Sequence, residues 1–412
     1  MKEKKAPEIR FKGFTDDWEQ RKVGDTCKIN GRIGFRGYTE KDIISKEAGG
    51  VLTFSPTNIV DNKLTMDCKN TYITREKYDE SPEIMIKNGD ILFVKTGSTL
   101  GKSALVTGLD EDASINPQIV VMRVEEGTEA FFSNVLITQD VLKQVTAVRI
   151  GGAVPTMTET ELKNFVYYEP TSKAEKNKIG EYFSNLDNLI TLHQRKHKKL
   201  LSVKKSMLEK MFPQNGAKVP EIRFEGFTDD WEQRKFSELY ARSSEKNDGS
   251  IGMDKNITVA TMQFKNDVKV STTEYLKTYY TFKLGDIAFE GHQSKEFRYG
   301  RFVENDIGNG IVSHIFAVFR PIQEYDLYFW KYAINNETLM QRILARSTKA
   351  STMMHDLVTN DFLNETFLVP SVKEQKQIGA FLNKLDNLIT LHQRELDKLV
   401  NIKKSMLEKM FV

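Results

Sequence analysis

The sequence predicts a mixed α/β protein in which two globular α/β domains are joined by two long antiparallel coiled-coil helices, with a pseudo-twofold internal repeat. Two pairs of nearly identical segments carry this prediction. Residues 7–22 recur at 220–235, and residues 186–195 recur at 385–394, whereas the stretches between the copies hardly match. A duplicated framework with divergent inserts is typical of a scaffold that presents two different binding domains.

The second repeated pair predicts the helices. Apolar positions follow one another at alternating spacings of four and three residues, which is the pattern of a coiled-coil seam. A helix from about Lys173 to Met211 would be roughly 58 Å long. Two such helices with matching seams pack most simply on each other, and the inserts lie at opposite ends of a pseudo-symmetric object only if the helices are antiparallel. The expected seam residues are Ile179, Phe183, Leu186, Ile190, His193, Leu200, Met207, Ile378, Leu382, Leu385, Ile389, His392, Leu399 and Met406.

The first repeated pair is a short segment of mixed charge. Its first copy carries the aromatic residues Phe11, Phe14 and Trp18, and Gly13 interrupts any long helix. Such a segment is either a surface strap, held to a neighbouring element by its aromatic side chains, or a direct contact to a partner. The sequence leaves both interpretations open. The predicted divisions of the chain are a strap at 1–22, an insert at 23–170, a helix at 171–212, a linker with the second strap at 213–235, an insert at 236–370 and a helix at 371–412.

The two inserts share a faint common plan. Gly89-Asp90-Ile91 in the first and Gly285-Asp286-Ile287 in the second each open an apolar run that leads into a polar loop. The loops, at 95–103 and 290–301, differ in sequence. One fold with different loop chemistry is the pattern expected when binding specificity is the variable property.

The composition excludes several classes of protein. With only Cys27 and Cys68, the chain can build neither a disulfide framework nor a cysteine metal site, which indicates reduced thiols inside a cell. No run of 18 apolar residues and no signal peptide is present, so a cytoplasmic protein without membrane contact is expected. The net charge of +3, from 60 basic and 57 acidic residues, does not by itself indicate nucleic-acid binding, although it can hide a basic face.

Two segments resemble catalytic motifs without matching them. Residues 97–103 resemble a phosphate-binding loop but have three residues between the glycines where a P-loop has four, so a glycine-containing hairpin loop is the better interpretation. Asn116-Pro117-Gln118 lacks the second proline and the aromatic residue of an adenine methyltransferase loop. A metal at His193 and His392 is not expected, because each helix offers one histidine at this place and His197 is replaced by Leu396 in the second copy. We expect no catalytic residues in this chain.

Taken together, the straps, the two GDI strands, the helix start EQKQIGAFLNKLDNLITLHQR and the helix end KKSMLEKMF resemble the specificity subunit of type I restriction–modification enzymes over essentially the whole chain. The first helix departs slightly from this pattern, with Glu175-Lys176-Asn177-Lys178 where the second has Glu374-Gln375-Lys376-Gln377. The resemblance implies that each insert is a target recognition domain reading one half of a split double-stranded DNA site. It implies that the helices set the gap and dock two modification subunits.

The resemblance also implies a chain that binds no cofactor. S-adenosylmethionine would belong to the modification (methyltransferase) subunits, which methylate adenine N6, and ATP and Mg²⁺ to the restriction (endonuclease and translocase) subunits. Two alternatives remain at this point: a coiled-coil protein-interaction adaptor that never touches DNA, and a hydrolase or kinase that uses the loop at 97–103.

Side chains suited to DNA gather in the polar loops and in two further arginine-containing segments of the inserts. Arg, Lys, Asn and Gln read base edges, and Lys, Arg, Ser and Thr contact phosphates. Any one of these residues could equally be a solvated surface side chain. The expected DNA-binding residues are Arg32, Arg36, Lys95, Thr96, Ser98, Thr99, Lys102, Arg149, His292, Gln293, Ser294, Lys295, Arg298, Tyr299, Arg301, Arg346, Lys349, Ser351 and Thr352.

Overall fold

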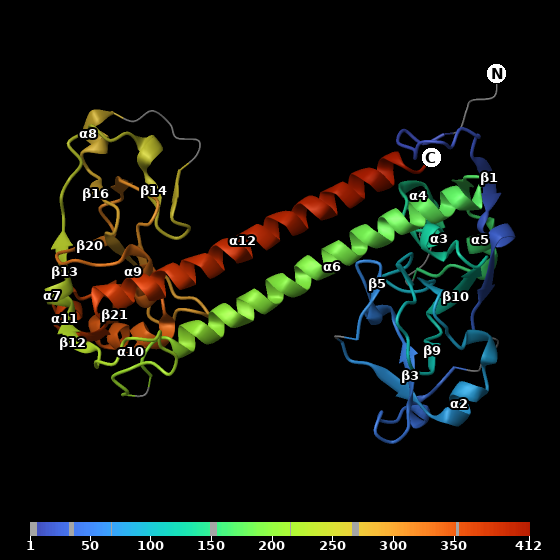
Figure 1. Cartoon of the computed structure of the whole chain (residues 1–412), viewed down its shortest axis with the longest axis horizontal. Helices are drawn as coiled ribbons and strands as arrows, with labels where there is room; N and C mark the ends of the chain where they lie inside the picture. Colours follow the sequence, from blue (N-terminus) through green and yellow to red (C-terminus); the bar gives the residue numbers. More distant parts are fainter. Residues whose placement is uncertain are drawn as a thin grey trace. The chain divides into compact units, whose positions relative to one another are not determined.

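The computed structural model describes residues 6–32, 37–66, 68–148, 155–214, 216–265, 272–351 and 354–412. The chain divides into two compact units, Met1–His193 with Glu395–Val412, and Gln194–Arg394. Both long helices, α6 (Lys173–Lys210) and α12 (Val372–Lys409), contribute to both units (Figure 1). The mixed α/β fold and the two long helices that the sequence predicts are confirmed.

The first insert is built on a four-stranded antiparallel sheet in the order β2–β10–β7–β8. All four side chains of the central strand β7 are buried. Ile91 and Phe93 face a core that includes helix side chains, while Leu92 and Val94 face a second core against the three-stranded sheet β6–β3–β9. A strand covered on both faces is apolar throughout, as this one is. The strands and helices are β2 (Cys27–Asn30), β3 (Val51–Phe54), β4 (Ile59–Val60), β5 (Lys63–Leu64), β6 (Thr71–Ile73), β7 (Ile91–Val94), β8 (Ser103–Leu105), β9 (Ala113–Ile115), β10 (Ile119–Val124), α1 (Val23–Thr26), α2 (Arg75–Asp79), α3 (Glu129–Val135), α4 (Gln139–Val148) and α5 (Glu159–Asn164).

The second insert repeats this plan. Its four-stranded antiparallel sheet has the order β13–β20–β17–β18, so each strand occupies the place of its counterpart in the first insert. The common plan expected from the two GDI segments is therefore confirmed. The strands and helices are β13 (Tyr240–Ser243), β14 (Ile257–Thr258), β15 (Gln263–Phe264), β16 (Tyr280–Phe282), β17 (Ile287–Glu290), β18 (Arg301–Glu304), β19 (Gly310–Val312), β20 (Ala317–Pro321), β21 (Thr348–Ala350), β22 (His355–Leu357), α7 (Phe236–Leu239), α8 (Thr273–Leu276), α9 (Leu327–Ile334), α10 (Glu337–Ser347) and α11 (Thr359–Asn364).

The GDI segments fasten the central strand of each sheet to its neighbour. The buried carboxylate of Asp90 accepts a hydrogen bond from the Lys87 backbone N–H at 3.0 Å and receives two from the Arg123 guanidinium at 3.0 and 3.1 Å. Asp286 and Arg320 make the same bidentate pair in the second insert, with both distances 2.9 Å. Because Arg123 lies on β10 and Arg320 on β20, this charge-assisted pair orients the strand that leads into each polar loop.

Each strap pairs with the strand that precedes a long helix. β1 (Glu19–Lys22) is antiparallel to β11 (Val166–Glu169), and β12 (Glu232–Lys235) is antiparallel to β23 (Thr366–Val369). Trp18 and Trp231, one from each strap, are both only 3 % exposed. The aromatic rings of the straps therefore pack inside their own units, which is the surface-strap interpretation.

A buried ion pair clasps each strap to a helix start. Arg10 donates two hydrogen bonds to Glu175 at 2.6 and 2.8 Å, and Arg223 donates two to Glu374 at 2.7 and 2.8 Å. Both glutamates are 1 % exposed. One residue earlier, the backbone N–H of each strap bonds the last turn of the other helix, at 2.9 Å from Ile9 to the Lys409 carbonyl and at 2.9 Å from Ile222 to the Lys210 carbonyl. Each strap thus joins the start of one helix to the end of the other.

Within each unit the two helices run antiparallel. In the first unit Phe183 packs on Phe411 with ring centroids 5.8 Å apart, and one turn further along α6, Asp187 meets Lys403 at 2.8 Å. In the second unit Lys204 meets Asp386 at 2.5 Å. The two ion pairs use the same repeat positions with the helices exchanged, as a pseudo-twofold repeat requires.

Among the expected seam residues, Ile179, Phe183 and Leu186 lie in the core of the first unit, and Ile378, Leu382 and Leu385 in the core of the second. Since they pack on the inserts as well, their burial does not by itself distinguish a coiled-coil seam from an ordinary domain core. The seam assignment therefore stays a prediction.

The second unit buries a polar cluster in its core. Both carboxylate oxygens of Glu304, the Tyr240 hydroxyl and the Trp330 indole N–H have no hydrogen-bond partner among the described residues. Burial, which disfavours the charged carboxylate, raises the pKa of Glu304 well above its ordinary value. The first unit has Cys27 at the repeat position of Tyr240, so this cluster belongs to the second unit alone.

We expect Glu304→Gln to flatten the pH dependence of stability. The folded state keeps the Glu304 proton at pH values where the unfolded chain, with an ordinary glutamate pKa, loses it. The free energy of unfolding therefore falls as the pH rises above about 4.5, by at most about 1.4 kcal/mol per pH unit. Urea unfolding midpoints at pH 5 and pH 8 should differ less for Glu304→Gln than for the wild type. The exposed Glu296→Gln is the control, and equal differences in all three proteins would contradict the prediction.

We expect Arg223→Met to lower the free energy of unfolding by about 3–5 kcal/mol, because it leaves the buried Glu374 carboxylate without its cation. Lys210→Met is the matched control, since it removes an exposed ion pair with Glu221 that is worth about 0–1 kcal/mol. Urea unfolding followed by tryptophan fluorescence measures both. Similar losses in the two variants would show that the clasp contributes no more than a surface pair.

Candidate nucleic-acid interface

Three segments meet at one end of the central sheet in the first unit. They are the loop after β7, the turn before β10 and the segment that precedes α5. The Lys95 N–H donates to the Gln118 carbonyl at 2.8 Å, and the Met157 N–H donates to the Lys95 carbonyl at 2.8 Å. Lys95 is thus the central residue of a small platform in which each segment is held by main-chain hydrogen bonds.

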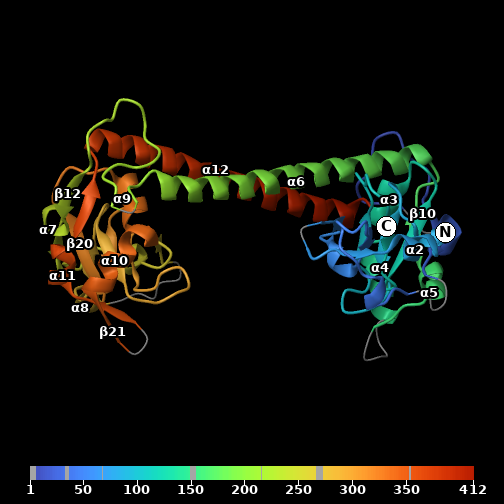
Figure 2. The ribbon, with the colours of Figure 1, turned by 90° about the horizontal axis from the view of Figure 1, so that it is seen from below.

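The second unit assembles the corresponding segments. The His355 N–H donates to the Gly291 carbonyl at 2.8 Å, and His292 and Met354 form an antiparallel bridge. Thr96 and Thr156 form the same bridge in the first unit. Met354 and His355 belong to the β21–β22 hairpin, which lies on the side of the second unit opposite α12 in Figure 2.

The loop after β7 is a hairpin loop. It connects two antiparallel strands, whereas a P-loop leads from a strand into a helix. The Gly101 N–H donates to the Val94 carbonyl at 2.9 Å, and the Lys102 N–H donates to the Thr99 carbonyl at 3.1 Å, so these donors close the turn. The hairpin interpretation of residues 97–103 is confirmed, because they do not form the strand-to-helix connection of a P-loop.

The expected DNA-binding residues of the first insert differ in how freely they face solvent. Ser98 and Lys102 are exposed, and Thr96 and Thr99 are half-buried. Lys95 lies 3.8 Å from the Glu159 carboxylate. Arg36 and Arg149 lie outside the described residues.

Arg32 is held firmly near this platform. Its guanidinium donates to the Ile115 carbonyl at 3.2 Å and lies 5.5 Å from the centre of the Tyr38 ring. Burial lowers its pKa. Tyr38 in turn accepts a hydrogen bond from the Asn116 amide at 2.8 Å, so the arginine is positioned by the end of β9 and, through Tyr38, by the turn before β10.

In the second insert the loop after β17 is open to solvent. Arg298 lies over the Tyr299 ring at 5.5 Å, and Tyr299 meets His355 edge to face at 5.4 Å. A hollow of about 250 Å³ in the same loop is lined by residues that include His292, Phe297 and Arg301, and Arg301 donates to Glu290 at 2.8 Å. The exposed loop side chains are His292, Gln293, Ser294, Lys295, Glu296 and Arg298.

The remaining expected residues of the second insert lie on or near the β21–β22 hairpin. Lys349 and Ser351 are exposed there, whereas Arg346 forms a surface ion pair with Glu365, with one N–O distance of 2.7 Å. Arg346 and Arg301 are thus already paired with carboxylates. Thr352 lies outside the described residues.

The sequence reasoning missed the turn that precedes β10 and β20. Gln118 is exposed beside the polar loop of the first insert, and His314 and Ile315 occupy the corresponding turn of the second. The sequence does contain a pattern that could predict this turn. Each turn directly precedes an apolar strand, and that strand must pair with the strand that begins at the GDI segment. In the sequence, Asn116-Pro117-Gln118 resembles only an incomplete catalytic motif.

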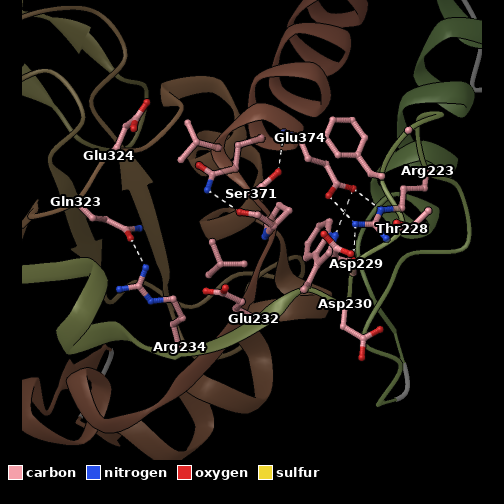
Figure 3. Close-up of a pocket in the computed structure, with 17 residues that line it drawn as sticks. Arg223, Thr228, Asp229, Asp230, Glu232, Arg234, Gln323, Glu324, Ser371 and Glu374 are labelled. Carbon is pink, nitrogen blue, oxygen red and sulfur yellow. Dashed lines mark hydrogen bonds and ion pairs between the residues drawn. The ribbon is translucent and has the colours of Figure 1, made fainter.

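A separate pocket of about 290 Å³ lies in the second unit between its strap and the start of α12 (Figure 3). Its labelled side chains include the Arg223–Glu374 clasp and Arg234, which donates to Gln323 at 2.7 Å. Two residues that line this pocket, Val369 and Gln375, correspond to Glu169 and Lys176 in the first unit. There the two side chains form an ion pair at 2.9 Å. The other acidic lining residues are Asp229, Asp230, Glu232 and Glu324, and this charge does not suit the phosphate backbone of DNA.

The described part of the chain contains no group of three or more histidine, cysteine, aspartate or glutamate side chains suited to a metal ion. It also contains no helix whose length and apolar character would suit a membrane span.

The model of the type I restriction modification DNA specificity domain family matches residues 15–202 and 228–401. The chain therefore belongs to this family, with one copy of the domain in each half of the sequence. The type I restriction enzyme MjaVIII specificity subunit of Methanocaldococcus jannaschii is 21 % identical, with 98 % of this chain and 95 % of that protein aligned. The crystal structure of the type I restriction-modification system S subunit from M. genitalium matches with a TM-score of 0.64 at 14 % identity, covering 99 % of each chain. This likeness supports the fold.

We expect Lys349→Ala to weaken DNA binding by this chain to a similar extent on all sequences. An exposed lysine that neutralises one phosphate contributes about one unit to the slope of log K against log salt. Arg346→Ala is the matched control. Because Arg346 is already paired with Glu365, its substitution should leave the slope unchanged. Binding measured over a series of salt concentrations tests this, and equal slopes for Lys349→Ala and the wild type would contradict a phosphate contact at Lys349.

Proposed function

We propose that the two inserts of this type I specificity subunit each read one half of a split double-stranded DNA site. The observation that supports this proposal is the repeated three-segment platform. The same strand order brings a loop, a turn and a third segment together in each insert, while the side chains differ. A constant frame with variable exposed residues is what two readers of different sequences require.

The chemistry of the two platforms favours an asymmetric site. Thr96 of the first platform and His292 of the second take the same place in the bridge described above, yet they offer different hydrogen-bonding groups. Base edges in the major groove are distinguished by their pattern of donors and acceptors. The two half-sites should therefore differ in sequence.

The long helices are the proposed ruler that sets the gap between the half-sites. Each is 38 residues long, which corresponds to about 57 Å. One turn of DNA advances roughly 34–36 Å, so a gap of several base pairs is compatible with a helix of this length. Each helix contributes residues to both units.

The helices are also the proposed docking surface for two modification subunits. Leu192 and Val400 are exposed in the first unit, and Leu391 and Leu201 are exposed in the second. These are the same repeat positions with the helices exchanged, so each unit presents an equivalent apolar pair. Two equivalent partners suit two equivalent surfaces.

The proposal assigns the chemistry to the partners. S-adenosylmethionine would bind the modification subunits and ATP with Mg²⁺ the restriction subunits, whereas this chain supplies the DNA sequence preference. Membership of the specificity family disfavours the adaptor that never contacts DNA.

The test is to map adenine methylation across the genome of a methylation-free host that expresses this chain with compatible modification subunits. We expect one split motif with a fixed gap and a methylated adenine in each half. The double variant Thr96→Ala/Gln118→Ala should relax only the half that the first insert reads, and the control Thr15→Ala in the strap should change neither half. Absence of methylation despite a stable complex would contradict the proposal.

A further inference from the structure

Ile315 is the most exposed large apolar side chain among the described residues, at 73 %. It lies in the turn that leads into β20, which is stabilised by a hydrogen bond of 3.1 Å from the Phe316 N–H to the Ser313 carbonyl. Exposing an isoleucine to water is unfavourable relative to burying it. A turn needs no apolar residue at its tip, so the packing of the turn does not explain this side chain.

The strand register places Ile315 in the candidate interface. Ala317 of β20 faces Phe289 of β17 at the end of their ladder, and Ile315 lies two residues before Ala317, at the end of the sheet where Gly291 begins the polar loop two residues after Phe289. In the first insert the corresponding position is Gln118, whose carbonyl accepts the Lys95 N–H at 2.8 Å. Ile315 and Gln118 are therefore structural equivalents on the two platforms.

A second exposed apolar side chain lies on the same platform. Met354 is 42 % exposed and is bridged through its main chain to His292. The equivalent residue of the first insert is Thr156, bridged to Thr96. Hence the first platform presents polar groups at both places, while the second presents Ile315 and Met354.

We propose that Ile315 contacts the C5-methyl group of a thymine in the half-site read by the second insert, with Met354 as a second exposed apolar side chain of the same platform. This inference deepens the proposed function and rests on it. The thymine methyl is the apolar group on the base edges of the major groove, and an apolar side chain is the usual means of reading it. Gln118, at the same place in the first insert, carries the amide that pairs with adenine instead.

The polar surroundings of Ile315 support a DNA ligand over a protein ligand. His292, Gln293 and Ser294, which follow Gly291 in the loop, are all exposed, and the exposed Lys295 and Arg298 outweigh the single negative charge of the exposed Glu296. A protein-docking surface has several apolar residues in its centre, whereas here two stand within hydrogen-bonding and cationic side chains. This mixture of apolar, hydrogen-bonding and cationic side chains suits a DNA base edge that carries one methyl group and lies beside phosphates.

The test uses the complex of the full chain with its modification subunits and duplexes that carry the mapped site. Each thymine of the second half-site, on either strand, is replaced in turn by deoxyuridine, which removes only the methyl group. At one position we expect the affinity of the wild-type complex to fall about fourfold, the effect of one methyl group leaving an apolar contact. In Ile315→Ala that difference in affinity between the thymine and the deoxyuridine duplex should disappear. Both duplexes should bind the variant complex more weakly than the thymine duplex binds the wild-type complex.

The control variant is Gln118→Ala, which should retain the deoxyuridine effect in the second half-site. The inference is overturned if no thymine there is sensitive, or if the sensitivity persists in Ile315→Ala. It is also overturned if Ile315→Ala prevents assembly with the modification subunits in the absence of DNA. Failure of the proposed function itself is distinguishable, because no split methylated motif would then be found.

Discussion

The buried arginine–glutamate clasp is the constraint on which the arrangement of each unit depends. A carboxylate that is 1 % exposed is strongly destabilising unless a cation meets it, so Glu175 and Glu374 require Arg10 and Arg223. Meeting this requirement brings a strap from far away in the sequence onto the start of a long helix. The adjacent main-chain N–H groups of each strap then bond the end of the other long helix. Sheet pairing of β1 and β12 continues from the strap, so the clasp sets where each insert begins.

The repeated helices contact the two inserts through insert residues that differ between the first and the second unit. Asp187 and Asp386, from the two LDNLITLHQR copies, each bind a lysine of the other helix. The insert of the first unit joins this pair through Lys63, which donates to the Asp187 carbonyl at 2.8 Å, and that of the second through the Tyr332 hydroxyl, which donates to Asp386 at 2.6 Å. Conserving the helix side of the junction while varying the insert side allows one framework to carry two binding domains.

The GDI motif illustrates how such a frame tolerates variable loops. Its aspartate is satisfied by a backbone N–H and by an arginine of the neighbouring strand, so the strand is fixed before the loop begins. The loop residues that follow are free to differ because the sheet does not depend on them. The hydrogen bonds that fix the sheet are thus independent of the solvent-exposed loops and turns. For this reason Ile315 can stay exposed without disturbing the strand pairing of β20.

Local patterns in the sequence by themselves determined the duplication, the span of the two long helices, the common plan of the inserts and the hairpin nature of residues 97–103. Helix periodicity and turn residues act over a few positions, so they are legible in one sequence. Only the tertiary structure decided that the straps clasp helix starts, that Arg301 and Arg346 are already paired, and that the turns at Gln118 and Ile315 belong to the platforms. These outcomes join residues that are 11 to 165 positions apart, as with Arg301–Glu290 and Arg10–Glu175. Strand register and burial select such partners, and neither quantity is local to the chain.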